Sequence, residues 1–192
     1  MKKIFILSVI SICVFMLSTV YSVSVQNELS KNLTRLHIIA NSNTALDQSV
    51  KYRVRDEVLD YVKTQKTLPT TTELESVTSG FLSKIGVPYT ASATLENCYV
   101  PKKDYKSISL PQGRYNCIKI TLGKGEGENW WCVAYPPLCY TESMFGDLSE
   151  DGILELEKIL SGEIMSVIKN GTDINFRFKI VDEIQRLINH YT

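Results

Sequence analysis

The chain has 192 residues, of which 44% are apolar and 22% charged, a composition typical of one globular domain with a short additional segment. Its 21 basic and 21 acidic side chains leave no net charge. This balance gives no support to a protein that binds nucleic acid, or a membrane surface, through a basic patch.

The N-terminus carries the clearest physical signal. Two lysines follow Met1, and residues 4–25 contain no charged side chain. This pattern predicts an export segment, and the run is long enough to span a bilayer as a helix, which takes about 20 residues. We therefore expect residues 1–25 to be a signal peptide or an N-terminal membrane anchor, and residues 26–192 to form a single extracytoplasmic signalling domain. Ser22-Val-Ser24 is a mediocre cleavage site, so both alternatives stay open.

Periodicity predicts the elements that follow. Alternating apolar and polar residues predict strands near 33–40, 89–100, 114–122 and 130–135. Apolar residues at helical spacing predict helices near 45–65, 73–85, 150–169 and 175–190. The expected fold class is α+β, a small antiparallel sheet packed with these helices, plus the N-terminal hydrophobic helix. In the first of the four helices Leu46 is expected to face inward, and Lys51 and Arg55 are expected on a solvated face.

Four cysteines follow the export segment, in a compartment where disulfides persist. They allow three pairings. If the strands near 89–100 and 114–122 pair antiparallel, Cys98 and Cys117 point to the same outer face, which favours a Cys98–Cys117 bridge. The second predicted bridge is Cys132–Cys139.

Residues 121–140 are the densest part of the chain, with both tryptophans, two of the prolines and the glycines of Gly123-Lys-Gly-Glu-Gly-Glu-Asn129. Glycines can crowd backbone amides around a phosphate. However, this spacing fits neither the P-loop nor the dinucleotide fingerprint, the loop precedes a strand rather than a helix, and its glutamates would repel an anion. We expect no nucleotide and no other cofactor.

Two further chemistries have candidates among these residues. Cys132 or Cys139 could act as a nucleophile with His37 or His190 as base, but no third group is evident. Zinc ligation requires cysteines two to four residues apart, a spacing that the four exported cysteines lack. We therefore expect no metal and no catalytic residue.

Trp130 and Trp131 are adjacent in a predicted strand and must face opposite ways. One belongs in the core. The other is either covered by a helix or exposed as an anchor for a protein partner.

Several motifs resemble the stage II sporulation protein R family. They are Arg35-Leu-His-Ile-Ile-Ala-Asn-Ser42, Asp47-Gln, Val54-Arg-Asp56, Leu110-Pro-Gln-Gly-Arg-Tyr115 and the run from Leu122 to Cys139. The resemblance covers roughly residues 35–140. Its motif residues include Arg35, His37, Asn41, Ser42, Arg55 and Asp56. The chain departs from the family pattern in carrying the extra pair Cys98 and Cys117.

The resemblance implies a signalling protein of endospore formation with no reaction of its own. Such a protein is exported from the forespore into the space between the forespore and mother-cell membranes. There it is required to activate a membrane-embedded aspartic protease, stage II sporulation protein GA, which processes the precursor of sigma factor E. The expected partner is this protease, with membrane contact through residues 4–25.

We expect the partner-binding surface to lie around residues 124–139. The predicted contact residues are Lys124, Asn129, Trp130, Trp131, Pro136 and Pro137, with Gly123, Gly125 and Gly127 shaping the loop. The alternative is an exported enzyme, such as a cell-wall hydrolase, that uses His37, Cys132 or a carboxylate such as Glu126 or Glu128. A structural component of the intermembrane space is a third possibility.

Overall fold

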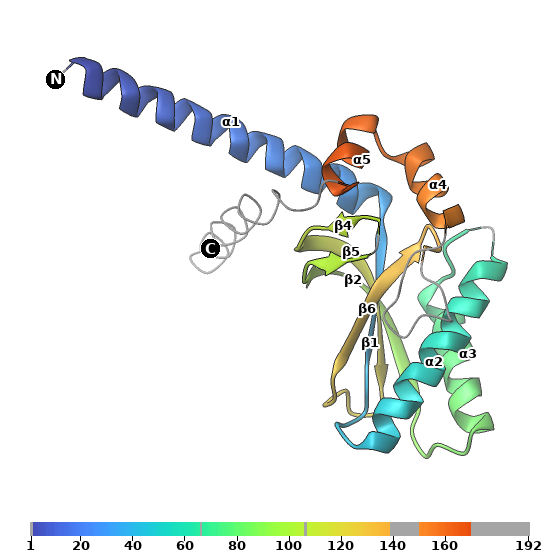
Figure 1. Ribbon diagram of the computed structural model, residues 1–192. Helices are drawn as coiled ribbons and strands as arrows, with labels where there is room; N and C mark the ends of the chain where they lie inside the picture. Colours follow the sequence, from blue (N-terminus) through green and yellow to red (C-terminus); the bar gives the residue numbers. More distant parts are fainter. Residues whose placement is uncertain (1, 66, 106, 139–149, 170–192) are drawn as a thin grey trace.

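The computed structural model describes residues 2–65, 67–105, 107–138 and 150–169 (Figure 1). The helices are α1 (Lys2–Asn32), α2 (Ala45–Thr64), α3 (Thr71–Lys84), α4 (Glu150–Ile159) and α5 (Gly162–Lys169). The strands are β1 (Thr34–Ile39), β2 (Ala91–Val100), β3 (Lys103–Asp104), β4 (Ser109–Leu110), β5 (Gly113–Leu122) and β6 (Asn129–Tyr135).

Four strands form one mixed sheet in the order β2-β5-β1-β6. The α+β class is confirmed, and β2 pairs antiparallel with β5 as predicted. The expectation of a purely antiparallel sheet is wrong, because β1 pairs parallel with β5. The chain between these strands passes through α2, α3 and β2, and this long crossover is what allows a parallel pair.

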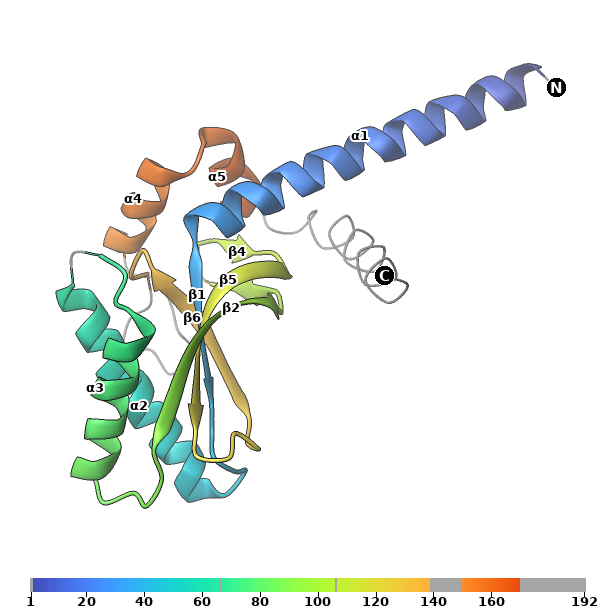
Figure 2. The same ribbon diagram turned by 180° about the vertical axis from the view of Figure 1, so that it is seen from behind.

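Helices α2 and α3 cover one face of the sheet, which we call the helix-covered face (Figures 1 and 2). Alternate strand residues point toward these helices, because successive side chains of a strand face opposite sides. The core on this side is apolar; it includes Leu36, Ile38, Ile118, Ile120, Val54, Val58, Leu74 and Leu82. Leu46 is an exception to the predicted pattern, since it lies at the exposed start of α2 and is 74% accessible.

The opposite face, which we call the second face, is covered only at one end. There α1 packs against β5, and Tyr115 donates a 2.8 Å hydrogen bond to the Pro111 carbonyl oxygen of the segment that crosses it. Strand alternation puts Tyr115 on the same outer face as Cys117, but both side chains are fully buried. The strand alternation is as predicted, but α1 and residues 101–112 supply a cover that a strand pattern does not reveal.

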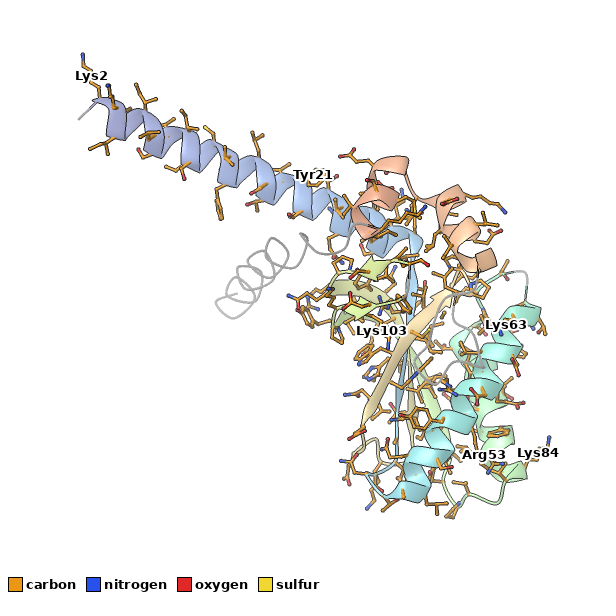
Figure 3. The ribbon with its side chains drawn as sticks, in the orientation of Figure 1. Lys2, Tyr21, Arg53, Lys63, Lys84 and Lys103 are labelled. Atoms are coloured by element: carbon orange, nitrogen blue, oxygen red, sulfur yellow. The ribbon has the colours of Figure 1, made fainter. Side chains whose placement is uncertain are left out.

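Helix α1 runs without a break from the apolar N-terminal segment into the folded core. Ser22, Val25 and Leu29 are buried, and the Glu28 carboxylate accepts a 2.8 Å hydrogen bond from the Ser161 backbone at the start of α5. Toward Lys2 the side chains project away from the other described elements (Figure 3). The helix is long and apolar enough to cross a membrane, a test that a signal sequence also passes. The expected boundary at residue 25 falls inside this helix.

The C-terminal region only partly tests the prediction. The helix expected near 150–169 is two helices, α4 and α5, separated by Leu160 and Ser161 just before Gly162. Glycine weakens a helix interior, which accounts for the interruption. The helix expected near 175–190 lies outside the described residues.

Candidate functional site

The glycine-rich turn between β5 and β6 is held by the segment that follows β1. Asn41 accepts a 2.9 Å hydrogen bond from the Lys124 backbone through its side chain, and a 3.1 Å bond from the Glu126 backbone through its carbonyl oxygen. Gly127 donates to Ala40 at 2.9 Å. The backbone amides of residues 123–127 are therefore all hydrogen-bonded within the protein, which leaves none of these five to bind a phosphate.

Two of these glycines are required by the geometry. Gly123 has φ 54°, in the left-handed region that residues with a side chain rarely adopt. A Cβ at Gly127 would overlap the backbone carbonyl of Ser42. The predicted loop-shaping glycines thus sit where the chain turns and where two backbones meet.

Asp47 organises the other side of this turn. One carboxylate oxygen accepts hydrogen bonds from Ser42 at 2.5 Å and from Asn41 at 2.8 Å, and the other accepts from the Tyr89 hydroxyl at 2.7 Å. The Ser42 hydrogen bond is the main reason that the pKa of Asp47 lies below its ordinary value, and burial acts against it. These bonds tie the start of α2 to the glycine-rich loop.

Trp130 belongs to the helix-covered face. It is 9% exposed, and the Arg55 guanidinium carbon lies 5.6 Å from its ring centroid. Arg55 and Lys51 were expected on a solvated face, which is wrong, since both are buried. Both cations have polar partners that helical periodicity does not reveal: Arg55 pairs with Asp56 at 2.7 Å, and the Lys51 ammonium donates to the distant Glu128 carbonyl oxygen at 3.1 Å.

Trp131 points to the second face, where it is only half-buried. Its ring stacks on the His37 imidazole with centroids 3.7 Å apart and an interplanar angle of 12°. His37 Nε2 lies 2.7 Å from Asn129 Oδ1; because this oxygen can only accept, Nε2 donates. The two rings and the amide therefore form one ordered unit, which we call the His37–Trp131 cluster.

Burial is the main reason that the pKa of His37 lies below its ordinary value, although the Asn129 hydrogen bond acts in the opposite direction. The imidazole is therefore neutral at pH 7. Next to it on the sheet, Lys119 and Glu96 form a partly exposed ion pair at 2.9 Å. Strand alternation puts both side chains on the second face, but their pairing depends on the β2–β5 register, which a sequence does not fix.

The predicted contact residues do not form one contiguous patch. Lys124 and Asn129 lie exposed near the start of β6, while Pro136 and Pro137 follow its end, about 20 Å away at 3.3 Å per residue. Pro136 is buried and Pro137 half-buried. Of the predicted set, only Asn129 and Trp131 are brought together, and His37 joins them from β1.

The cysteines differ in whether they are disulfide-bonded or free. Cys132 is fully buried and disulfide-bonded, so it presents no thiol for catalysis. Cys139, its predicted partner, lies outside the described residues. Cys98 and Cys117 do lie on the same face, but the predicted bridge is not formed: both are free thiols.

In the described part of the chain, His37 is not paired as a catalytic base and no metal centre is formed. His37 contacts neither a carboxylate nor a thiol, and no group of acidic, histidine and cysteine side chains there could hold a metal ion. An open depression near the end of α3 contains no charged group; it is lined by Ser79, Ser83, Val87, Pro88, Tyr89, Thr90 and Gly123.

These features define an α+β protein with an N-terminal helix of membrane-spanning length and a second sheet face that is partly open. The chain belongs to the stage II sporulation protein R family, whose model matches residues 30–144. It is 34% identical over 128 residues to stage II sporulation protein R of Bacillus subtilis (strain 168), a match over 59% of this chain and 56% of that protein. The match thus spans little more than half of that relative.

No solved structure matches the chain. Family membership establishes a role in sporulation, and the apolar helix is compatible with secretion or with membrane anchoring.

Proposed function

We propose that this chain is an exported signal of endospore formation that activates the membrane-embedded protease stage II sporulation protein GA, and so promotes processing of the sigma factor E precursor. On this proposal it acts in the space between the forespore and mother-cell membranes. Family membership and the apolar α1 support the proposal.

The observation that carries the choice of surface is the His37–Trp131 cluster. A half-exposed tryptophan held in one orientation loses little entropy on binding, and tryptophan is among the residues that most often dominate interface energies. Ion-paired Lys119 and Glu96 beside it form a polar rim of the kind that surrounds such anchors. We propose that the extracytoplasmic part of the protease docks on this part of the second face.

The test is precursor cleavage in cells that contain the protease, the sigma precursor and the full chain. Trp131→Ala is expected to abolish or strongly reduce cleavage at an unchanged level of the protein. Leu95→Ala is the matched control, because Leu95 is also a large apolar residue of the sheet and is 61% exposed, but it lies on the opposite face. It is expected to leave cleavage unchanged.

Normal cleavage with Trp131→Ala, at wild-type protein level, would contradict the proposed surface. Failure of the wild-type chain to promote cleavage when all three components are present would contradict the activation itself. The two results are separate, so each part of the proposal can fail alone.

A further inference from the structure

The second face contains a pair of thiols that the proposed signalling function does not use. Cys98 on β2 is half-buried, and Cys117 on β5 is fully buried. In the β2–β5 register Cys117 lies opposite Glu96 and Cys98 lies opposite Tyr115, so the cysteines are diagonal neighbours on one face. Their thiols are hydrogen-bonded to each other, and the Cys117 sulfur also lies 3.8 Å from the Ile118 carbonyl oxygen.

Arg35 lies beside this pair. It stands opposite Cys117 in the parallel β1–β5 register, and its side chain is fully buried. Nε donates to the Cys132 carbonyl oxygen at 3.0 Å, and the guanidinium carbon lies 5.2 Å from the Tyr115 ring centroid. Neither Nη1 nor Nη2 has a hydrogen-bond partner among the described residues.

The two terminal NH₂ groups of a buried guanidinium are costly to leave unpaired, because they lose hydration that no described group here replaces. The surroundings of Arg35 therefore favour a negative charge nearby. A thiolate on the neighbouring Cys98 would supply it, whereas Glu96 already pairs with Lys119 on the more exposed part of the face.

The two thiols differ in the direction in which their surroundings shift the pKa. The hydrogen bond from Cys117 is the main reason that the pKa of Cys98 is lowered, and the charges of Arg35 and Lys119 add to it, while burial and Glu96 oppose it. The pKa of Cys117 is raised, chiefly by the same hydrogen bond and by burial. One thiol is thus accessible and readily ionised, while the other is enclosed and keeps its proton.

We propose that Cys98 and Cys117 form a redox-active dithiol, in which Cys98 is the nucleophile toward disulfides and Cys117 is the resolving thiol. The Cys98 thiolate attacks one sulfur of an external disulfide, which forms a mixed disulfide and releases the other sulfur as a thiolate. Cys117 then attacks the Cys98 sulfur and passes its proton to the second external sulfur, which leaves as a thiol. The protein pair is oxidised, and the external disulfide is reduced to two thiols.

The co-reactant is a disulfide of a small thiol or of an exported oxidoreductase, and both react by the same exchange chemistry. The product bridges the edge strand β2 to β5. This inference does not rest on activation of the protease, because its readout is thiol chemistry alone.

The experiment uses the full chain in detergent with Cys13→Ala, which removes the free thiol of α1. The protein is mildly reduced, desalted and treated with oxidised glutathione, and then analysed by intact mass and by peptide mapping that also follows Cys132. We expect loss of both free thiols and a crosslinked Cys98–Cys117 peptide.

Two further variants separate the roles of the thiols. Cys117→Ser is expected to accumulate a stable glutathione adduct on Cys98, because nothing resolves it. Cys98→Ser is expected to remain unmodified while folded and to react only in denaturant. In the Cys117→Ser background, Arg35→Met is expected to slow adduct formation and Arg35→Lys to restore it, with circular dichroism showing that each variant is folded.

The proposal is overturned if both thiols stay free in the folded Cys13→Ala chain. It is also overturned if Cys117 in Cys98→Ser forms an adduct as fast as Cys98 in Cys117→Ser. If an adduct persists on Cys98 while Cys117 is present, the resolving role fails. The same assay with an oxidised thioredoxin-like protein in place of glutathione distinguishes a protein disulfide from a small one.

Discussion

Trp130 and Trp131 are adjacent in β6 but lie on opposite faces of the sheet and have different contacts. Trp130 packs under α2 beside Arg55, whereas Trp131 stacks on His37 on the half-open second face. The helix-covered face owes its composition to packing, since apolar residues of two helices and four strands meet there. The second face keeps an imidazole, an indole, an ion pair and a thiol pair, which packing alone does not require. The two faces therefore separate the residues that maintain the fold from those available for chemistry.

The largest expected effect tests this division directly. Trp130→Ala should lower the free energy of unfolding by about 3–5 kcal/mol, because it leaves a cavity under α2. Trp131→Ala should lower it by only about 1 kcal/mol, through the loss of stacking. Urea unfolding of the full chain in detergent measures both, and in each variant the remaining tryptophan reports on its own face. Equal losses would remove the distinction between the faces.

The glycine-rich turn joins β5 to β6, the strand that carries both tryptophans, and it should tolerate substitution less well than its exposure suggests. Gly127→Ala should destabilise the chain by about 1–3 kcal/mol, because the added methyl group meets the Ser42 backbone. Gly162→Ala is the matched control: nothing lies within 4 Å of its Cβ position, and alanine is preferred in a helix. Thermal unfolding of both variants should show opposite changes in midpoint.

The carboxylate of Asp47 should make the stability of the fold depend on pH. Asp47→Asn should reduce stability by about 1–3 kcal/mol at pH 7, where the carboxylate accepts its hydrogen bonds in charged form. Since the folded-state pKa is lowered, this stabilisation is present above the unfolded pKa of about 3.9 and is lost as pH falls through the folded value. Unfolding at a series of pH values should show wild type and variant converging in acid; a constant difference would argue against it.

The ion pair of the second face should have the smallest effect. A double-mutant cycle on Lys119→Ala and Glu96→Ala should give a coupling of no more than about 1 kcal/mol, because both side chains are partly exposed. Added salt should reduce it further. A larger coupling that resists salt would mean that this face is less open than its accessibility indicates.

Much of the fold follows from local patterns. The four strands of the mixed sheet, α2 and α3 lie within a few residues of their expected positions, because alternation and helical spacing report directly on which face is buried. The short strands β3 and β4 were not predicted. The parallel β1–β5 pair does not follow, since pairing depends on how the intervening crossover packs. Lys51 and Arg55 also resist prediction: the Glu128 carbonyl oxygen that accepts from Lys51 lies just before β6, and the Trp130 ring that Arg55 contacts lies in β6.

The candidate site likewise has features that the sequence predicts and features that it does not. The sequence predicts that the tryptophans face apart and that Cys98 and Cys117 share a face, because both follow from strand geometry. It does not predict that His37 stacks on Trp131, which requires the β1–β6 register. Nor does it predict that Arg35 is buried beside the thiols, because the cover over that end of the sheet comes from distant parts of the chain.

The unbroken α1 limits how far the folded domain can move from a membrane that holds its N-terminus. Val20 is 66% exposed, and the sheet begins at Thr34, about 20 Å of helix further on at 1.5 Å per residue. An uncut chain would therefore keep its sheet within one domain diameter of the lipid surface and meet partners by lateral diffusion in two dimensions. Cleavage near Ser24 would release the domain to the whole surrounding volume and lower its effective concentration at that surface. One peptide bond thus decides whether the domain stays at one membrane surface or diffuses away from it.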